Sequence, residues 1–226
     1  MLREDMTSTR SMGDPREWFN LNRGRRYHQA VEEWEIPSGD LDAYLDALKE
    51  HAATDNGVVG VKLFEVHLQQ LVSEGMLPEG PGRLRVLAER FGTPEPVILT
   101  LTRNNKLRQA ISFAKAKQTS QWGTQGEAQG KAEFDRKMIE ADLVALIERE
   151  NRWDRELEAS GYAPDLRLIY EVVQYEREET LLGIARSLEL PDPEGIVASR
   201  DIEENRLARQ ADHLTEGWVN KFIRWK

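Results

Sequence analysis

The sequence contains no cysteine, and this absence excludes several kinds of chemistry. Without thiols the chain cannot form a disulfide bond, a thiolate zinc site or a cysteine nucleophile. Its four histidines are scattered, and none stands at a recognisable metal-ligand spacing from another histidine or a carboxylate. We therefore expect no metal centre, and we expect each histidine to be a surface or packing residue.

Long apolar runs are also missing. No stretch approaches the about 20 apolar residues that span a bilayer, and residues 1–20 lack the apolar core of a secretory signal. The sequence has neither the G-x-S-x-G elbow of many hydrolases nor a complete Walker loop. We therefore expect a cytoplasmic protein with no membrane span.

The charge balance is acidic. The 226 residues include 31 Lys and Arg against 40 Asp and Glu, a formal net charge of -9. This balance argues against a broad nucleic-acid-binding surface, although a local basic pocket for a small anion stays open. The chain is long enough to bury a hydrophobic core, and 39% of its residues are hydrophobic. We predict one domain over residues 1–226, with a C-terminal helical segment, 203–226, packing on it.

Three continuous apolar runs, bounded by turn residues, predict strands at 57–64, 96–103 and 166–171. Continuous rather than alternating runs favour strands that are covered on both faces, as in a parallel sheet. Helical patterns separate the strands, which predicts an α/β fold with right-handed crossovers. These patterns fall at residues 40–53, 64–73, 105–121, 134–160, 180–188 and 215–225.

Two stretches are predicted loops. Residues 75–82 form a Gly/Pro connection, and residues 120–133 are rich in Gln and Gly. We expect the second loop to be mobile, either as a lid over a substrate or simply as an exposed loop.

Residues 98–122 carry the most specific pattern. A predicted strand ends on Arg103, and a helix with Asn105 as its N-cap begins at once. The N–H groups of that helix would then face the ligand crevice. Arg108 and Ser112 fall on the polar face of this helix. Because Arg103 stands at the end of the strand and Ser112 lies two turns into the helix, their side chains can bind one phosphate together. The alternative is a solvated amphipathic helix whose arginine pairs with a carboxylate.

The sequence of residues 102–122, T-R-N-N-K-L-R-Q-A-I-S-x(5)-Q-T-S-Q-W, resembles the 3′-phosphate-binding segment of the bacterial trehalose sulfotransferases, a family of carbohydrate sulfotransferases. Residues 13–19, GDPREWF, are similar to that family's G-x-P-x-E-[YFW]-F element. Further similar segments follow in the same order: 56–63 (second strand), 153–171 (W…G…P…YE) and 210–222 (Q-A-D…W…F).

This resemblance implies a P-loop-type, three-layer parallel sheet and a sulfotransferase. The implied donor is 3′-phosphoadenosine-5′-phosphosulfate (PAPS), no metal is needed, and the acceptor is a hydroxyl of a sugar or glycolipid. The resemblance implies that Glu17 is the catalytic base; the alternative is a solvated Glu17 in a segment that only ends one helix. Lys62, at the carboxyl end of a predicted strand, faces the sulfuryl group or the acceptor, or forms a structural salt bridge. Arg103, Ser112 and Arg108 would bind the donor. Trp18, Phe19 and Trp122 would stack on sugar or adenine, or belong to the core.

The resemblance has one gap. Members of that family begin with a strand and a P-R-[ST]-G-[ST]-[ST] loop that cradles the 5′-phosphosulfate. Residues 1–5 instead match the middle of the following helix. We therefore expect a chain that lacks the first strand and the leaving-group site, as in a truncated gene model or fragment, and that can be inactive as given.

Two alternatives stay open. One is a non-catalytic remnant of the same family that keeps a nucleotide pocket or only a protein-interaction surface. The other, a P-loop kinase relative, is weaker because no Walker lysine or metal-binding acidic pair can be assigned. A homodimer is compatible with the helical faces, and the sequence does not identify the sugar.

Overall fold

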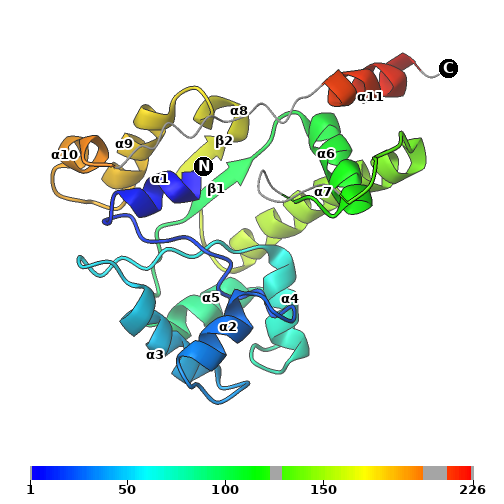
Figure 1. Ribbon diagram of the computed structural model, residues 1–226. Coiled ribbons are helices and arrows are strands. Elements are labelled where there is room, and N and C mark those ends of the chain that lie inside the picture. The colour runs from blue at the N-terminus through cyan, green and yellow to red at the C-terminus, as the bar shows by residue number, and fades with distance from the viewer. Residues whose placement is uncertain (1, 123–128, 201–212, 225–226) are drawn as a thin grey trace.

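A computed structural model describes residues 2–122, 129–200 and 213–224 of the chain (Figure 1). The Q-A-D residues of the predicted 210–222 element, 210–212, and the middle of the predicted mobile loop, 123–128, lie outside these ranges. The elements are α1 (Leu2–Ser8), α2 (Arg26–Glu33), α3 (Leu41–Ala52), α4 (Glu65–Ser73), α5 (Arg83–Arg90), β1 (Leu99–Thr102), α6 (Lys106–Thr119), α7 (Arg136–Ala159), β2 (Leu166–Ile169), α8 (Tyr170–Val173), α9 (Arg177–Ser187), α10 (Pro193–Ala198) and α11 (His213–Arg224).

The sheet is small. β1 and β2 pair in parallel, with Leu99 opposite Leu166 and Thr102 opposite Ile169. The prediction of an α/β fold with a parallel sheet is confirmed in this reduced form. The prediction that the strands are covered on both faces is wrong for β1, because Leu101 is 50% exposed. Within the described ranges the sheet has two strands, so the fold is helix-rich.

The segment 57–64, predicted as a strand, is extended but not part of the sheet. Its backbone makes only single bridges, from Val59 to Ala53 and from Val61 to Arg16. The reason is its neighbours: a turn at Gly57 folds it back on the end of α3, and a loop rather than a strand lies along its other side. The strand prediction here is therefore corrected to an extended connection.

The helices that the periodic patterns predicted are present. Three of them begin at a residue whose side chain caps the first turn: Asp40 accepts from Ala43 N, Asn105 from Arg108 N, and Asp135 from Met138 N. Four helices, α2, α5, α8 and α10, lie in stretches where no helix was predicted. Neither α2 nor α5 has a side-chain cap, and both are short and rich in charge, so their patterns were weak.

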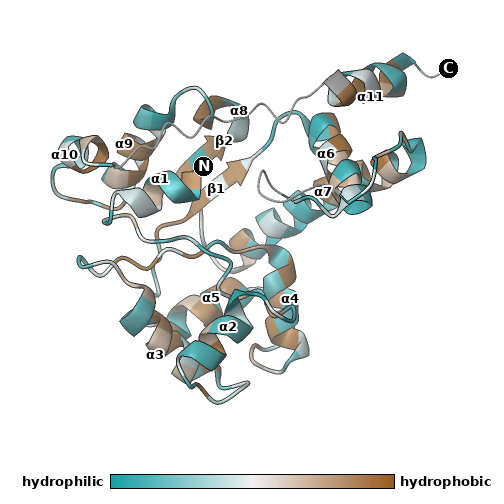
Figure 2. Cartoon of the chain, viewed as in Figure 1, coloured by the Kyte–Doolittle hydropathy of each residue, from teal (hydrophilic) through white to brown (hydrophobic). Residues whose placement is uncertain are grey.

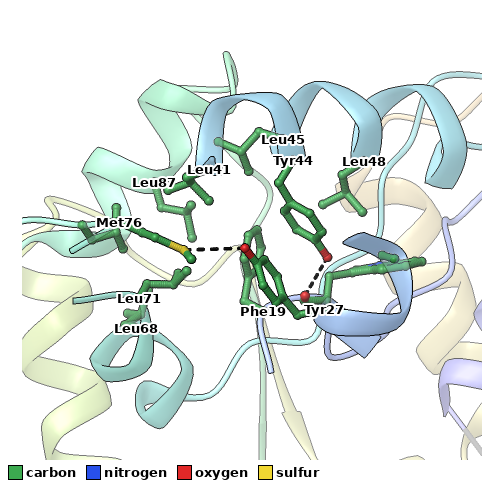
Figure 3. Close-up of a cluster of buried hydrophobic side chains, with 13 residues drawn as sticks. Phe19, Tyr27, Leu41, Tyr44, Leu45, Leu48, Leu68, Leu71, Met76 and Leu87 are labelled. Carbon is green, nitrogen blue, oxygen red and sulfur yellow. Dashed lines mark hydrogen bonds between the residues drawn. The ribbon is translucent and has the colours of Figure 1, made fainter. Parts of the chain in front are cut away.

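The largest core cluster joins α2, α3, α4 and α5, which gather in the lower part of Figure 1. Its centre contains rings and aliphatic side chains that are almost fully buried (Figure 3). The Tyr44 hydroxyl donates to the backbone oxygen of Trp18 at 2.7 Å. This bond satisfies the one polar atom of a buried ring and fixes the chain next to residue 17.

Two further clusters lie among the described residues. One joins α1, β2, α8, α9 and α10 through residues such as Met6, Leu168 and Ile184. The other joins α6, α7 and α11 through residues such as Ile111 and Trp218. Figure 2 shows hydrophobic colour along β1 and β2 and on parts of the surrounding helices. The sheet lies beside the second cluster, and α6 carries the chain from β1 into the third.

Candidate active site

Two extended segments, residues 13–18 and 57–62, cross at a pair of glycines. A Cβ atom on Gly13 would lie 2.5 Å from the backbone nitrogen of Gly60, and one on Gly60 would lie 2.8 Å from that of Pro15. Gly13 also has a φ of +78°, which favours glycine. The Lys62 N–H donates to the Arg16 oxygen at 2.8 Å, and this bond fixes the register of the crossing.

The crossing brings Glu17 and Lys62 together, although they are 45 positions apart in the sequence. The Lys62 ammonium donates to Glu17 Oε1 at 2.9 Å, and the Asn20 amide donates to Glu17 Oε2 at 2.9 Å. Burial acts to raise the pKa of Glu17, but the hydrogen bonds from Lys62 and Asn20 outweigh it and hold that pKa below its ordinary value. The carboxylate is therefore ionised at neutral pH and can accept a proton.

His67 lies beside this pair on the first turn of α4. Its side chain is 2% exposed, and its Nδ1 accepts the backbone N–H of Phe64 at 3.3 Å. Burial lowers the pKa of His67, and the Lys62 charge acts in the same direction against the Glu17 charge. The imidazole is therefore neutral at pH 7 and acts as a helix cap, which agrees with the packing role predicted for it.

Arg103 leaves β1 next to Tyr170, which follows β2. Its guanidinium carbon lies 3.7 Å from the centroid of the Tyr170 ring. Within the described residues this guanidinium makes no ion pair or hydrogen bond. An arginine with its donors unengaged is suited to bind an anionic oxygen group.

The start of α6 differs from the prediction. We expected its N–H groups to face the ligand, but the N–H groups of Asn104 and Asn105 donate to the Glu171 carboxylate, at 3.1 and 3.2 Å. The Arg108 N–H is taken by the Asn105 side chain. The protein itself satisfies these donors, so an anion here must be held mainly by side chains.

Ser112 and Arg108 have different environments on α6. Ser112 is half-buried, and its hydroxyl has no hydrogen-bond partner among the residues that the structure describes. The Arg108 guanidinium instead makes a bidentate ion pair with Glu216 on α11, with 2.8 Å between Nη2 and Oε2. The alternative interpretation of a helix arginine that pairs with a carboxylate thus fits Arg108 and does not fit Arg103.

The three aromatic candidates are also divided. Trp18 and Phe19 are 3% and 2% exposed and belong to the largest core cluster, so they offer a ligand little ring surface. This burial favours the core role that the sequence left open for these two rings. Trp122 is 60% exposed and meets Phe113 edge to face, with 5.5 Å between the ring centroids. Trp122 therefore keeps an open face.

The candidate residues form two groups. Glu17, Lys62 and Asn20 lie at the glycine crossing, whereas Arg103 and Ser112 lie on the β1–α6 unit. No hydrogen bond or ion pair between described residues joins the groups directly. Sequence reasoning missed Asn20, whose signal was its position three residues after Glu17 in a turn.

No described helix has the length and apolar character to cross a bilayer. Among the described residues there is also no group of three or more His, Cys, Asp or Glu that could hold a metal ion.

Comparison with known proteins gives one finding. A family model described as Stf0 sulphotransferase matches residues 1–224. This match confirms the resemblance to the trehalose sulfotransferases that the motifs indicated. A search of curated proteins finds no match.

Proposed function

The chain belongs to the Stf0 sulphotransferase family, and from this premise we propose that it transfers a sulfuryl group from PAPS to a hydroxyl of a carbohydrate. The observation that carries the proposal is the contact between Glu17 and Lys62, 2.9 Å apart at a backbone crossing that only glycines permit. This arrangement supplies a charged base and a cation at one point, which is what transfer to a hydroxyl requires.

Glu17 is the proposed general base. Its carboxylate is ionised and held by donors on both oxygens, so its position is fixed before a ligand arrives. When the acceptor oxygen attacks sulfur, its proton passes to Glu17. The new S–O bond forms as the bond to the 5′-phosphate oxygen breaks, and that oxygen leaves with the electron pair.

Lys62 has two proposed tasks. In the free protein its ammonium pairs with Glu17 and keeps the carboxylate ionised. With 49% of its side chain exposed, it can also turn toward a sulfuryl oxygen and stabilise the charge there. That movement would remove one donor from Glu17 and make it a stronger base.

Arg103 and Ser112 are the residues proposed to hold the 3′-phosphate of the donor. The residues fit this group, because the Arg103 guanidinium is unengaged and the Ser112 hydroxyl has no partner among the described residues. The donor supplies an activated sulfuryl group when bound. We assign no residue of this chain to its 5′-phosphosulfate, and Trp122, with its open ring face, is the proposed contact for the sugar.

The test is a transfer assay. The protein is incubated with radiolabelled PAPS and a panel of sugars that includes trehalose, and sulfated products are identified by mass spectrometry. Glu17→Gln keeps the size of the side chain but removes the base, so we expect the rate to fall by about 10²- to 10⁴-fold. Glu32→Gln, an exposed carboxylate on α2, is the matched control and should leave the rate unchanged.

Two outcomes would contradict the proposal. A Glu17→Gln variant with full activity would remove Glu17 as the base. Binding of adenosine 3′,5′-bisphosphate without any sulfated product would instead favour a non-catalytic nucleotide-binding protein.

A further inference from the structure

The two residues that follow β2 hold the segment that follows β1. Since Thr102 pairs with Ile169, Arg103 and Tyr170 leave the sheet side by side. The Tyr170 ring lies under the Arg103 guanidinium, 3.7 Å from ring centroid to carbon. The next residue, Glu171, accepts the N–H groups of Asn104 and Asn105, one on each carboxylate oxygen.

We propose that Tyr170 and Glu171 are positioning residues for Arg103 and that together they set the selectivity of the protein for a nucleotide with a 3′-phosphate. This inference rests on the proposed function, in which Arg103 binds that phosphate. Neither residue needs to touch the ligand: each acts on the conformation of residues 103–105.

Tyr170 acts on the Arg103 side chain. A guanidinium over an aromatic face is attracted by the electrons of the ring, and stacking leaves the N–H edge of the guanidinium free in its own plane. That edge is the part that grips phosphate bidentately. A carboxylate in the place of the ring would also orient the arginine, but it would occupy the same donors and compete with the ligand. A half-buried ring holds Arg103 without consuming its charge.

Glu171 acts on the backbone. Its two oxygens tie down consecutive N–H groups, and the second of these belongs to the N-cap of α6. The carboxylate also lies near the positive end of that helix, where a negative charge is favourable. Burial acts to raise the pKa of Glu171, but the N–H groups of Asn104 and Asn105, with the Arg103 charge, bring that pKa below its ordinary value. The Glu171 carboxylate, which clamps residues 104 and 105, is therefore charged at neutral pH.

The arrangement also explains why the side chain of Arg103 must do the binding. Because Glu171 already occupies the N–H groups of residues 104 and 105, these groups are not available to a phosphate. The Glu171 carboxylate thus occupies backbone N–H groups that could have bound an anion at the start of α6, and in return it fixes the backbone from which the Arg103 side chain projects. A variant in which residues 103–105 are less rigidly held should therefore bind the 3′-phosphate more weakly.

Isothermal titration of the full chain tests this with two nucleotides, adenosine 3′,5′-bisphosphate and adenosine 5′-monophosphate. We expect Tyr170→Leu to weaken binding of the bisphosphate about tenfold and to leave the monophosphate unchanged. Tyr170→Phe keeps the ring and should restore the bisphosphate affinity to within about twofold. Glu171→Ala should weaken the bisphosphate about three- to tenfold, whereas Glu176→Ala, an exposed carboxylate nearby, should not.

Each outcome has a distinct meaning. If Tyr170→Phe is as weak as Tyr170→Leu, or if Tyr170→Leu weakens both nucleotides equally, the positioning role is wrong. If the wild type does not prefer the bisphosphate, and Arg103→Gln changes nothing, the proposed function fails instead. Circular dichroism melting checks that each variant folds, and Tyr170→Met replaces Tyr170→Leu if the latter does not.

Discussion

The hydrogen-bond donors around Glu17 keep its carboxylate ionised, and a single substitution can remove the donor that Lys62 provides. Because the pKa of Glu17 is held below its ordinary value partly by Lys62, Lys62→Met should raise that pKa. The base works only when it is ionised, so the acidic limb of the kcat/KM profile should move to higher pH. A pH–rate profile measures the shift. Lys49→Met, which breaks an exposed pair with Asp46, should leave the limb in place; a shift to lower pH would contradict this role of Lys62.

Gly60 is the second residue on which the site depends. The Cβ of an alanine at this position would lie 2.8 Å from the backbone nitrogen of Pro15. A backbone atom cannot relieve such a clash by changing rotamer, as a side chain can. Gly60→Ala should therefore lower the free energy of unfolding by about 1–3 kcal/mol and reduce transfer activity. Urea denaturation gives the first quantity.

Gly183→Ala is the matched control for Gly60→Ala. Gly183 lies inside α9, where an added Cβ would only touch Leu166 at 3.5 Å. Alanine favours a helix more than glycine does, so stability should rise by up to about 1 kcal/mol. Equal losses in the two variants would show that the crossing has no special steric demand.

At this scale the sequence predicted residue types better than contacts. Motif order identified Glu17 and Arg103, but spacing cannot bring Glu17 to Lys62 across 45 positions; the glycine crossing does that. Nor can spacing say that Arg108 rather than Arg103 has a carboxylate partner, since Glu216 arrives from the other end of the chain. Tyr170 belonged to a recognised motif, yet its role became visible only through the register of β1 and β2.

At the scale of elements, one deeply buried ring of α11 packs in the cluster that joins this helix to α6 and α7. Trp218 is 2% exposed and meets Phe134 edge to face, with 5.8 Å between the ring centroids. Trp218→Ala should lower the free energy of unfolding by about 3–5 kcal/mol. Trp122→Ala, in which a 60% exposed ring is removed, should lower it by about 1 kcal/mol. Chemical denaturation compares them, and a similar small loss in both would mean that α11 is not docked as described.

Helices were more predictable than strands because their signals are local. A cap and a three- or four-residue period located α3, α6 and α7 with their N-terminal residues. The apolar run at 57–64 had the composition of a strand, but a strand also needs a partner, and its partners are a turn and a loop. Pairing is a property of the tertiary structure, so the run alone did not reveal it.

At the scale of the whole molecule, Glu156 joins two core clusters. This carboxylate is 3% exposed and accepts from the Arg83 guanidinium at 3.0 and 3.1 Å and from the backbone of Leu84 at 2.9 Å. It thereby ties α7 to α5. Glu156→Ala leaves the nearly buried Arg83 guanidinium with only its longer ion pair to Glu65, at 3.8 Å, so the free energy of unfolding should fall by about 3 kcal/mol.

Glu158→Ala controls for the loss of a carboxylate from the same helix. Glu158 is exposed, so its removal should change stability by no more than about 0.5 kcal/mol. Urea denaturation of both variants decides the matter: if Glu156→Ala is as mild as Glu158→Ala, the contacts of Glu156 do not hold the two clusters together.

The glycine crossing has a consequence for the order of folding. Helices α6 and α7 are consecutive and can pair early, and their pairing shortens the effective distance between β1 and β2. The contact between Gly13 and Gly60 must close a loop that contains α2 and α3. These two helices pack against each other in the largest core cluster, and their packing shortens that loop in the same way. We therefore expect Glu17 to meet Lys62 only after α2 and α3 have packed, so a refolding chain should regain its catalytic base only after this cluster has formed.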